Sequence, residues 1–354
     1  MTSLDDNGFP STATSVAIGS DGLGLVSYYY GQTGDLRVAH CQNVACSSVT
    51  ISTIDASASA GGHYSSIAIG VDGLALISYY DSGNEDLKVA HCVDLACTSA
   101  TTATLDSAGD VGWNTSLTIG PDGVGLIAYF DFTNLDLKVA HCQDVACSSA
   151  TTTTVDSGPN IGWEPSIAIG PDGLGLISYA DLANGDLKVA HCEDSPCFTT
   201  TRTAIDTAGS VGRDTSIATG ADGLGLVSYM DEGNFDLKVA HCSNVACTSA
   251  TAATIDGGGN VGSGNALTIG PDGLGLISYH DSTQGDLKVA RCRDINCSNA
   301  SLTTVANQGD TGWDTAATFG ADGLPLISFI DLSLARLKVA HCSNTLCIPN
   351  FRGR

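Results

Sequence analysis

A unit of about fifty residues is repeated seven times along this 354-residue chain. Each copy contains a segment close to Asp-Leu-Lys-Val-Ala-His-Cys, and the cysteine that ends it recurs at a near-constant step. These cysteines are Cys41, Cys92, Cys142, Cys192, Cys242, Cys292 and Cys342. A period of roughly 20 to 50 residues is typical of solenoids, propellers and arrays, whose neighbouring copies bury a continuous core. Positions that are identical in all copies therefore serve the scaffold, and positions that differ are free for function or drift.

Each copy predicts four short β-strands. In the second copy these are residues 66–69, 74–80, 87–92 and 101–105, and Gly-Val-Asp-Gly forms the first turn. The second segment is almost entirely apolar, as expected of a strand covered on both faces. No stretch of the chain shows helical periodicity. Four strands per copy in seven copies predict an all-β fold, a seven-bladed β-propeller of four-stranded antiparallel blades.

The prediction is a single domain over residues 1–354. Its repeats run approximately over residues 5–55, 55–106, 106–156, 156–206, 206–256, 256–306 and 306–354. Thr2–Asp5 matches the fourth strand of a repeat, whereas residues 348–354 break the threonine-rich pattern after the last copy. We therefore expect the amino-terminal strand to complete the last blade and close the ring.

The first hairpin of each copy follows the pattern Gly-x-Asp-Gly-Leu-x-Leu-Ile-Ser-Tyr, as in residues 70–79. This hairpin resembles the NHL-type and Asp-box repeats of the seven-bladed β-propeller superfamily in its secreted bacterial forms. The chain departs from related patterns, since it lacks Trp-Asp and Gly-His signatures and the Ser-x-Asp-x-Gly-x-Thr-Trp box. The resemblance implies a fold and leaves function open, because propellers host binding modules and enzymes alike.

Fourteen cysteines form one Cys-x4-Cys pair in each copy. The pairs are Cys41 and Cys46, Cys92 and Cys97, Cys142 and Cys147, Cys192 and Cys197, Cys242 and Cys247, Cys292 and Cys297, and Cys342 and Cys347. The even count and the regular spacing predict disulfides within blades and a secreted or periplasmic location. Zinc binding is the alternative, since His91 precedes Cys92, but the repeat offers no fourth ligand. Free thiols are the remaining alternative.

The charge balance is strongly acidic, with 38 Asp and Glu against 14 Lys and Arg and a formal net charge of −24. This argues against nucleic acid and anionic membranes, which require basic surface. Apolar residues never run uninterrupted for long enough to span a bilayer, so no membrane insertion is predicted. The first residues lack a basic segment followed by an apolar one, so no signal peptide is expected there.

One face of the predicted disc differs from copy to copy. Before the first strand the copies have Thr12, His63, Trp113, Trp163, Arg213, Ser263 and Trp313, and at the end of the second strand Tyr29, Tyr80, Phe130, Ala180, Met230, His280 and Ile330. Aromatic-lined surfaces with a few polar groups commonly bind ligands. The predicted ligand-binding residues are His63, Tyr64, Tyr80, Trp113, Phe130, Trp163, Arg213, His280 and Trp313. The alternative is that these side chains only wedge neighbouring blades apart.

Acidic loops on the same face give a weaker prediction of calcium. The pattern Asp-x-x-Asn-x-Asp places the candidate ligands at Asp81, Asp86, Asp131, Asp136, Asp181 and Asp186. Hard cations prefer several carboxylate and carbonyl oxygens. Ordinary Asx-turns explain the same spacing and are the favoured interpretation. No other cofactor is expected.

Histidines and lysines occupy constant positions. Six copies have His after Val-Ala, and Arg291 is the exception; six copies have Lys, and Arg37 is the exception. A catalytic group would not be copied six times. We therefore expect scaffold roles, with the histidines hydrogen-bonded between blades and each lysine paired with an aspartate.

No catalytic motif is present: there is no Gly-x-Ser-x-Gly elbow, His-Glu-x-x-His helix or phosphate loop. The leading hypothesis is an extracellular binding propeller whose variable face engages a glycan, polymer or protein. One alternative is a glycoside hydrolase-like or lyase-like enzyme that uses carboxylates on this face. Another is a structural protein that is calcium-stabilised or self-assembling. The sequence does not decide among them.

Overall fold

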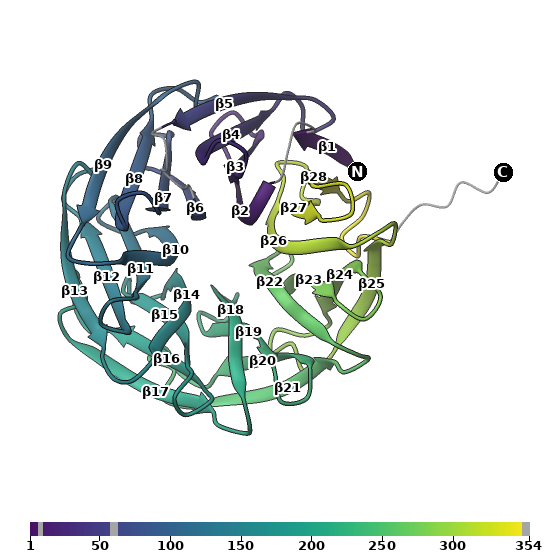
Figure 1. Ribbon diagram of the computed structural model, residues 1–354. Coiled ribbons are helices and arrows are strands. Elements are labelled where there is room, and N and C mark those ends of the chain that lie inside the picture. Colours follow the sequence, from purple (N-terminus) through teal and green to yellow (C-terminus); the bar gives the residue numbers. More distant parts are fainter. Residues whose placement is uncertain (6–9, 57–62, 349–354) are drawn as a thin grey trace.

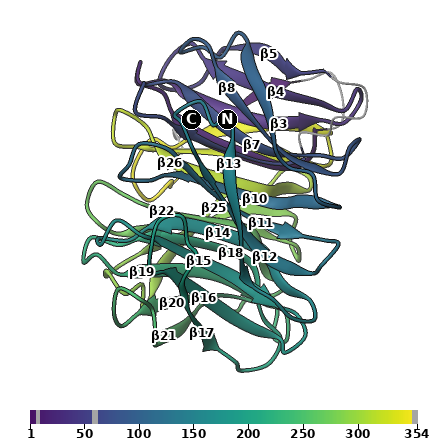
Figure 2. The ribbon, with the colours of Figure 1, turned by 90° about the vertical axis from the view of Figure 1, so that its left-hand side faces the viewer.

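The computed structural model describes residues 1–5, 10–56 and 63–348. Seven four-stranded antiparallel sheets surround a central axis, one for each repeat (Figure 1). Seen from the side, the seven sheets together form a disc (Figure 2). The predicted seven-bladed β-propeller is confirmed. Within the described residues, no helix has the length and apolar character needed to cross a membrane.

In blades 1 to 6 the strands follow one another outward in sequence order. Blade 1 contains β2 (Pro10–Ile18), β3 (Gly24–Tyr30), β4 (Asp35–Cys41) and β5 (Val49–Asp55). Blade 2 contains β6 (His63–Ile69), β7 (Ala75–Asp81), β8 (Asp86–Cys92) and β9 (Ala100–Asp106). Blade 3 contains β10 (Val111–Ile119), β11 (Gly125–Asp131), β12 (Asp136–Cys142) and β13 (Ala150–Asp156).

The second half of the ring repeats this order. Blade 4 contains β14 (Ile161–Ile169), β15 (Gly175–Asp181), β16 (Asp186–Cys192) and β17 (Thr200–Asp206). Blade 5 contains β18 (Val211–Thr219), β19 (Gly225–Asp231), β20 (Asp236–Cys242) and β21 (Ala250–Asp256). Blade 6 contains β22 (Val261–Ile269), β23 (Gly275–Asp281), β24 (Asp286–Cys292) and β25 (Ala300–Ala306).

Blade 7 joins both ends of the described chain. It contains β26 (Thr311–Phe319), β27 (Pro325–Asp331), β28 (Arg336–His341) and, on the outside, β1 (Thr2–Asp5). The pairing is antiparallel, with Thr2 opposite Val339 and Ser3 opposite Lys338. The predicted closure by the amino-terminal strand is therefore confirmed (Figure 1).

The hydrophobic core lies between neighbouring blades. The second strand of a blade is buried along its whole length, as in β11 and β15. One cluster joins Leu137 and Val139 of blade 3 to Ile167, Ile177 and Tyr179 of blade 4. Full burial of such side chains stabilises a fold by about 1.5–3 kcal/mol each. A single blade cannot form this core alone, so the ring is one cooperative structure.

A carboxylate at the end of an outer strand ties each blade to the next, with one exception. Between blades 4 and 5, Asp206 Oδ2 accepts hydrogen bonds from Tyr229 Oη at 2.6 Å and from Lys238 Nζ at 2.5 Å. Burial alone would raise the pKa of Asp206, but hydrogen bonds from Lys238 and Tyr229 outweigh it and hold the pKa low. The equivalent sets, here called junction contacts, are Asp5–Tyr28–Arg37, Asp55–Tyr79–Lys88, Asp106–Tyr129–Lys138, Asp156–Tyr179–Lys188 and Asp256–Tyr279–Lys288.

The exception lies between blades 6 and 7. There the carboxylate is replaced by Ala306 and the tyrosine by Phe329, while Lys338 remains. Lys338 Nζ instead lies 2.5 Å from Asp331 Oδ2 in its own blade. The carboxylate acceptor and the hydroxyl donor are thus both absent at this junction. Neither Ala306 nor Phe329 therefore leaves a buried polar group without its hydrogen-bond partner.

The constant histidines bond differently from the prediction. His91 Nε2 lies 2.9 Å from Asp72 Oδ2, and both residues belong to blade 2. The same contact recurs in the other copies, with Arg291 and Asp272 taking its place in blade 6. The expected contact between blades is not the general one, although His141 Nε2 also lies 3.1 Å from Ser195 Oγ of blade 4. Each histidine instead fixes the Asp-Gly turn of its own blade, because strand three runs back alongside that turn.

All seven Cys-x4-Cys pairs form disulfides within their blades, as predicted, with Cα–Cα distances of 4.8–4.9 Å. No cysteine among the described residues is free, so neither the zinc nor the free-thiol alternative holds. Each disulfide joins the end of the third strand to the following turn. The bonded pairs are Cys41 with Cys46, Cys92 with Cys97, Cys142 with Cys147, Cys192 with Cys197, Cys242 with Cys247, Cys292 with Cys297, and Cys342 with Cys347.

The junction contact should show non-additive energetics. Asp206→Ala is expected to lower the free energy of unfolding by about 2–3 kcal/mol, because it removes the shared acceptor of a buried hydroxyl and an ammonium. Adding Tyr229→Phe should recover about 1 kcal/mol, since no buried hydroxyl is then left unpaired. Denaturant unfolding of both variants with intact disulfides measures this. A double variant less stable than Asp206→Ala contradicts the explanation.

Candidate functional site

Each innermost strand has a left-handed backbone at the same repeat position. In β10 this residue is Asn114, with φ of +50°. One extra residue is accommodated there, between the pairs Trp113–Phe130 and Ser116–Ala128. A bulge of this kind bends a strand and redirects its side chains. The equivalent residues, here called the inner ring, have φ between +43° and +76° and are Ala13, Tyr64, Asn114, Glu164, Asp214, Gly264 and Asp314.

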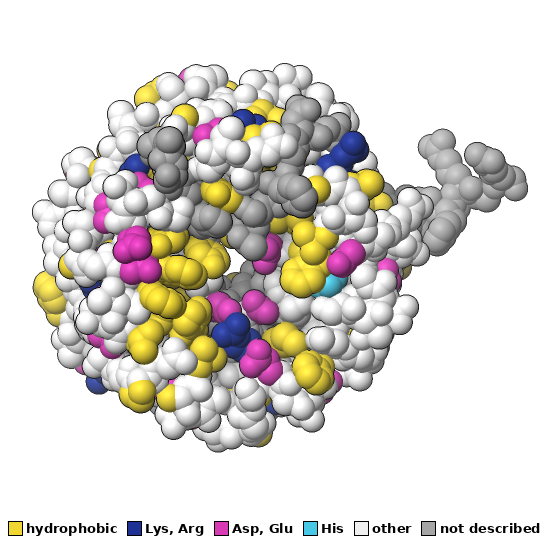
Figure 3. Space-filling model, viewed as in Figure 1, with side chains coloured by type: hydrophobic (Ala, Val, Ile, Leu, Met, Phe, Trp, Pro, Cys, Tyr) yellow, Lys and Arg dark blue, Asp and Glu magenta, His cyan; other side chains and the backbone are white. Residues whose placement is uncertain are grey.

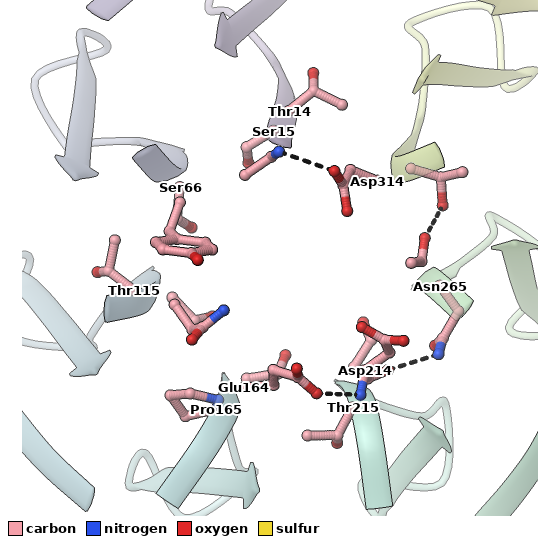
Figure 4. A pocket seen from close by; sticks show the side chains of 18 of the residues that line it. Thr14, Ser15, Ser66, Thr115, Glu164, Pro165, Asp214, Thr215, Asn265 and Asp314 are labelled. Carbon is pink, nitrogen blue, oxygen red and sulfur yellow. Dashed lines mark hydrogen bonds between the residues drawn. The ribbon is translucent and has the colours of Figure 1, made fainter. Parts of the chain in front are cut away.

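The inner ring surrounds a central cavity of about 450 Å³ whose wall comes from the innermost strands of all seven blades. Figure 4 shows Glu164, Asp214 and Asp314 pointing into this space. Three of the seven positions therefore present a carboxyl group to one cavity. Trp163 and Arg213 also line it, so the cavity is continuous with the variable face.

Backbone groups of the following blade hold these carboxyl groups. The Asp214 N–H donates to Glu164 Oε2 at 2.6 Å, and the Ala13 N–H donates to Asp314 Oδ2 at 3.3 Å. The Gly264 N–H donates in the same way to the carboxyl of Asp214. The bulged backbone thus has two roles. It directs its own side chain into the cavity, and its N–H group holds the carboxyl group of the preceding blade.

Burial shifts the protonation of all three acids. Burial, with a further contribution from Asp214, raises the pKa of Glu164 to about 7 despite the opposing effect of Arg213. Burial and the negative charge of Asp214 raise the pKa of Asp314 to about 6. Burial also raises the pKa of Asp214. Carboxyl groups whose pKa is raised by burial in a cavity cluster at functional sites.

One cation lies at the mouth of the cavity. Arg213 places a terminal nitrogen 3.1 Å from Glu164 Oε1 and its Nε 3.7 Å from Glu232 Oε1. Its guanidinium also lies 5.9 Å from the centre of the Trp163 ring, within the range of a cation–π contact. Arg213 is therefore already engaged by two carboxylates and an aromatic face.

Aromatic side chains from blades 2, 3 and 4 form an arc beside the cavity mouth. The aromatic arc consists of Tyr64, Tyr80, Trp113, Phe130, Phe132 and Trp163. Trp113 stacks on Phe132 with ring centres 5.0 Å apart, and Phe130 lies 4.4 Å from Trp163. Figure 3 shows apolar side chains gathered on this side of the mouth, with acidic groups in the opening.

The members of the arc differ in exposure. Phe132 is 42% exposed and the two tryptophans are partly exposed, whereas Tyr80 and Phe130 are buried beneath them. Hydrogen bonds fix the indoles, because Trp113 Nε1 donates to Asp110 and Trp163 Nε1 donates to Asn160, each at 2.6 Å. Polar groups thus hold the edges of both indoles, which remain partly exposed.

The predicted site residues divide into two groups. Tyr64, Tyr80, Trp113, Phe130, Trp163 and Arg213 come together around one side of the mouth. Trp313 and His280 form a separate pair, with ring centres 4.7 Å apart and His280 only 1% exposed. The side chain of His63 lies outside the described part of the structure. Whether any of these residues contacts a ligand remains a prediction.

The disulfide cysteines lie away from this site. Among the described residues, the lining of the central cavity includes no cysteine. The second cysteine of each pair is buried in the core between blades and has a left-handed backbone, with φ between +48° and +71°. The disulfides therefore hold the turn after the third strand and take no part in the candidate site. The second cysteines are Cys46, Cys97, Cys147, Cys197, Cys247, Cys297 and Cys347.

The sequence reasoning missed Phe132 and the three inner-ring acids. The position after Trp113 differs between copies as much as the position of Trp113 itself. Applying the same criterion one residue further along would have selected Glu164, Asp214 and Asp314. The sequence did not reveal the bulge that turns these three acids toward the axis. In a regular strand, neighbouring residues lie on opposite faces, so the residue after each variable position is expected to point away from the variable face.

The calcium prediction gains no support. The described part of the chain contains no group of three or more His, Cys, Asp or Glu side chains that could hold a metal ion. Asp81 accepts hydrogen bonds from the Gly83 and Asn84 backbone, which is the Asx-turn interpretation, and lies 3.4 Å from Lys88 Nζ. The repeated acids thus have a structural role in closing the loop.

Comparison with known proteins shows the fold alone. No protein-family model matches the chain, and no curated protein matches it in sequence. A protein of unknown function from Dyadobacter fermentans is 12% identical with a TM-score of 0.60, and 96% of each chain is covered. The polysaccharide lyase Uly1 is 11% identical with a TM-score of 0.57, covering 95% of this chain and 91% of that one.

An α-L-arabinofuranosidase from Fusarium graminearum is similar to the same degree. It is 11% identical with a TM-score of 0.56, and the match covers 96% of this chain and 94% of that one. At these identities, side chains of the neighbours cannot be transferred to this chain, so its site is interpreted from its own residues.

The raised pKa of Glu164 should make stability depend on pH. The folded state retains the Glu164 proton between its ordinary pKa of 4.5 and about 7, so stability falls as pH rises through this range. Glu164→Gln should therefore stabilise the protein at pH 8 by on the order of 2 kcal/mol, and hardly at all below pH 5. Denaturant unfolding at both pH values measures the effect. The exposed Glu193→Gln is the control, and an equal gain at both pH values contradicts the explanation.

Proposed function

We propose that this protein binds a carbohydrate chain across its variable face. The observation that carries the proposal is the continuity of the aromatic arc with the carboxyl-lined cavity, since Tyr64 and Trp163 belong to both. Sugar rings stack on aromatic planes through their apolar faces, and carboxyl groups accept hydrogen bonds from sugar hydroxyls. Trp113, Phe132 and Trp163 offer the planes, and the inner-ring acids offer the acceptors.

The charges favour neutral or amino sugars over uronic acids. Three carboxyl groups line the cavity, and Arg213 is already paired with Glu164 and Glu232. A polyanionic chain would meet carboxylates and no unpaired Lys or Arg among the described residues that line this mouth, on a protein of formal net charge −24. An ammonium group on the sugar would instead be attracted to the same carboxylates.

The structural neighbours agree with a carbohydrate ligand at the level of class. Two of them are described as a polysaccharide lyase and an α-L-arabinofuranosidase. A shared fold does not imply a shared function, so this supports the proposal without carrying it. Seven disulfides favour an extracellular or periplasmic location, where such ligands occur.

Catalysis on the same ligand is the second candidate. Glu164 has a pKa raised to about 7, and its carboxyl group lies against the backbone of the second acid, Asp214. Glycoside hydrolysis uses a protonated carboxyl group together with a second acid, and Glu164 and Asp214 are residues of these types. Incubating oligosaccharides with the protein and with Glu164→Gln distinguishes the two functions. Release of reducing ends by the native protein alone would establish catalysis.

The aromatic arc should carry the affinity. Trp113→Ala and Trp163→Ala are each expected to weaken oligosaccharide binding about tenfold, because each removes a stacking plane. The chain contains three tryptophans, so Trp313→Ala is a matched control outside the arc and should leave affinity unchanged. Titration calorimetry with oligosaccharides selected on a glycan array measures all three. Equal loss in all three variants would contradict the role of the arc.

The charge preference can be tested with oligomers that differ mainly in charge. Oligomers of glucosamine and N-acetylglucosamine are expected to bind at pH 7, and oligogalacturonate at least about tenfold more weakly. Combining Asp214→Asn with Asp314→Asn should narrow the difference between glucosamine and N-acetylglucosamine oligomers. Tighter binding of oligogalacturonate by the native protein would overturn the preference for neutral or amino sugars.

A further inference from the structure

The junction between blades 6 and 7 differs from the other six in a way that leaves room for a ligand. Elsewhere an aspartate carboxylate binds a lysine or arginine and a tyrosine across the junction. Here Ala306 removes the carboxylate and Phe329 removes the hydroxyl, but Lys338 is retained. The other copies therefore show which chemical group Lys338 would hold.

Further substitutions in blade 7 change polarity in the same direction. Thr311 stands where β10, β14, β18 and β22 have Val or Ile, so a hydroxyl replaces an aliphatic group. Arg336 stands where every other copy has aspartate. Relative to the other copies, this region has lost two acids, at positions 306 and 336, and has gained a base. Its local charge is shifted toward positive within a strongly acidic protein.

A cleft of about 170 Å³ opens at this point. Its lining includes Ser3 of β1, Ala306 at the end of β25, Gln308, Thr311 and Lys338. The volume is roughly ten times what a single water molecule needs. The cleft therefore lies where the missing carboxylate would be, and it is larger than that group.

Two donors face a carboxylate at this place in other blades. One is the lysine, as for Lys238 on Asp206. The other is the backbone N–H two residues beyond the aspartate, as for Ala208 on Asp206 at 3.0 Å and Gly258 on Asp256 at 3.1 Å. Gln308 occupies the corresponding position after Ala306 and lines the cleft.

The charge balance also favours an incoming anion. Lys88 is shared between Asp55 at 2.6 Å and Asp81 at 3.4 Å. Lys338 is close to Asp331, at 2.5 Å, and its cross-junction acid is replaced by Ala306. The other junctions likewise hold two carboxylates around one lysine, or around Arg37 between blades 7 and 1. A single added carboxylate would restore that balance here.

We propose that the cleft between blades 6 and 7 binds a small carboxylate, such as acetate or another short monocarboxylate. The carboxylate takes the place of the missing aspartate, with one oxygen on Lys338 Nζ and the other on the Gln308 N–H. The alkyl part lies against the Ala306 methyl group. The ligand thereby bridges the one junction that lacks its own carboxylate, and it stabilises the folded ring by mass action.

The test compares the native protein with Ala306→Asp, which supplies the carboxylate internally. Thermal unfolding and equilibrium dialysis are carried out at pH 7 with labelled acetate, at constant ionic strength maintained with chloride. The native protein should bind one acetate per chain and unfold at a higher temperature as acetate is added. Ala306→Asp should lose the binding and the shift. Sodium sulfate in place of acetate separates a carboxylate site from a general anion site.

A second variant tests whether the site can be moved. Asp256→Ala combined with Tyr279→Phe reproduces the loss of the carboxylate and the hydroxyl between blades 5 and 6, and should raise the stoichiometry to two acetates per chain. If this variant does not fold, the comparison with Ala306→Asp still decides. Equal acetate shifts in the native protein and Ala306→Asp, or no acetate bound to the native protein, would overturn the proposal. Sulfate binding of equal strength that Ala306→Asp abolishes would overturn the carboxylate preference.

Discussion

The ring depends on a buried aspartate carboxylate of one blade that accepts hydrogen bonds from side chains of the next blade. Each such aspartate ends an outer strand and accepts from a tyrosine and a cation in the following blade, as Asp206 does from Tyr229 and Lys238. The apolar contacts between blades tolerate sliding, but this polar group is satisfied in only one register. The junction contact therefore fixes how neighbouring sheets meet at six of the seven junctions. The amino-terminal strand extends the rule, since Asp5 carries the contact from blade 7 to blade 1.

The repeat made most of the fold predictable. Constant residues identified the strands, the disulfides and the lysine–aspartate pairing, and the match of Thr2–Asp5 to a fourth strand identified the closure. The histidine contact was predicted wrongly, because a constant residue reveals that it has a partner without revealing on which side the partner lies. His91 and Asp72 are both constant, and only the path of strand three brings them together.

The candidate site was predictable only in part. Variation among copies identified Trp113, Trp163 and Arg213, each of which directly precedes the left-handed residue of its inner strand. It did not identify the carboxyl-lined cavity, because a bulge places the next residue in a left-handed conformation and turns its side chain toward the axis. Phe132 lies in a loop after β11, at a position that also varies between copies but was not considered. The candidate site on blades 2 to 5 and the cleft at the blade 6/7 junction both lie where the copies depart from one another.

The left-handed backbone of the inner ring also limits which amino acids such a scaffold can place around its axis. A left-handed backbone is most readily adopted by glycine, asparagine and aspartate, and four of the seven inner-ring residues are of these types: Asn114, Asp214, Gly264 and Asp314. The neighbouring blade is anchored through the backbone N–H at these positions, so each side chain can change independently of the others. The side chains that face the cavity can therefore change one blade at a time. The left-handed backbone favours small polar and acidic residues at these positions.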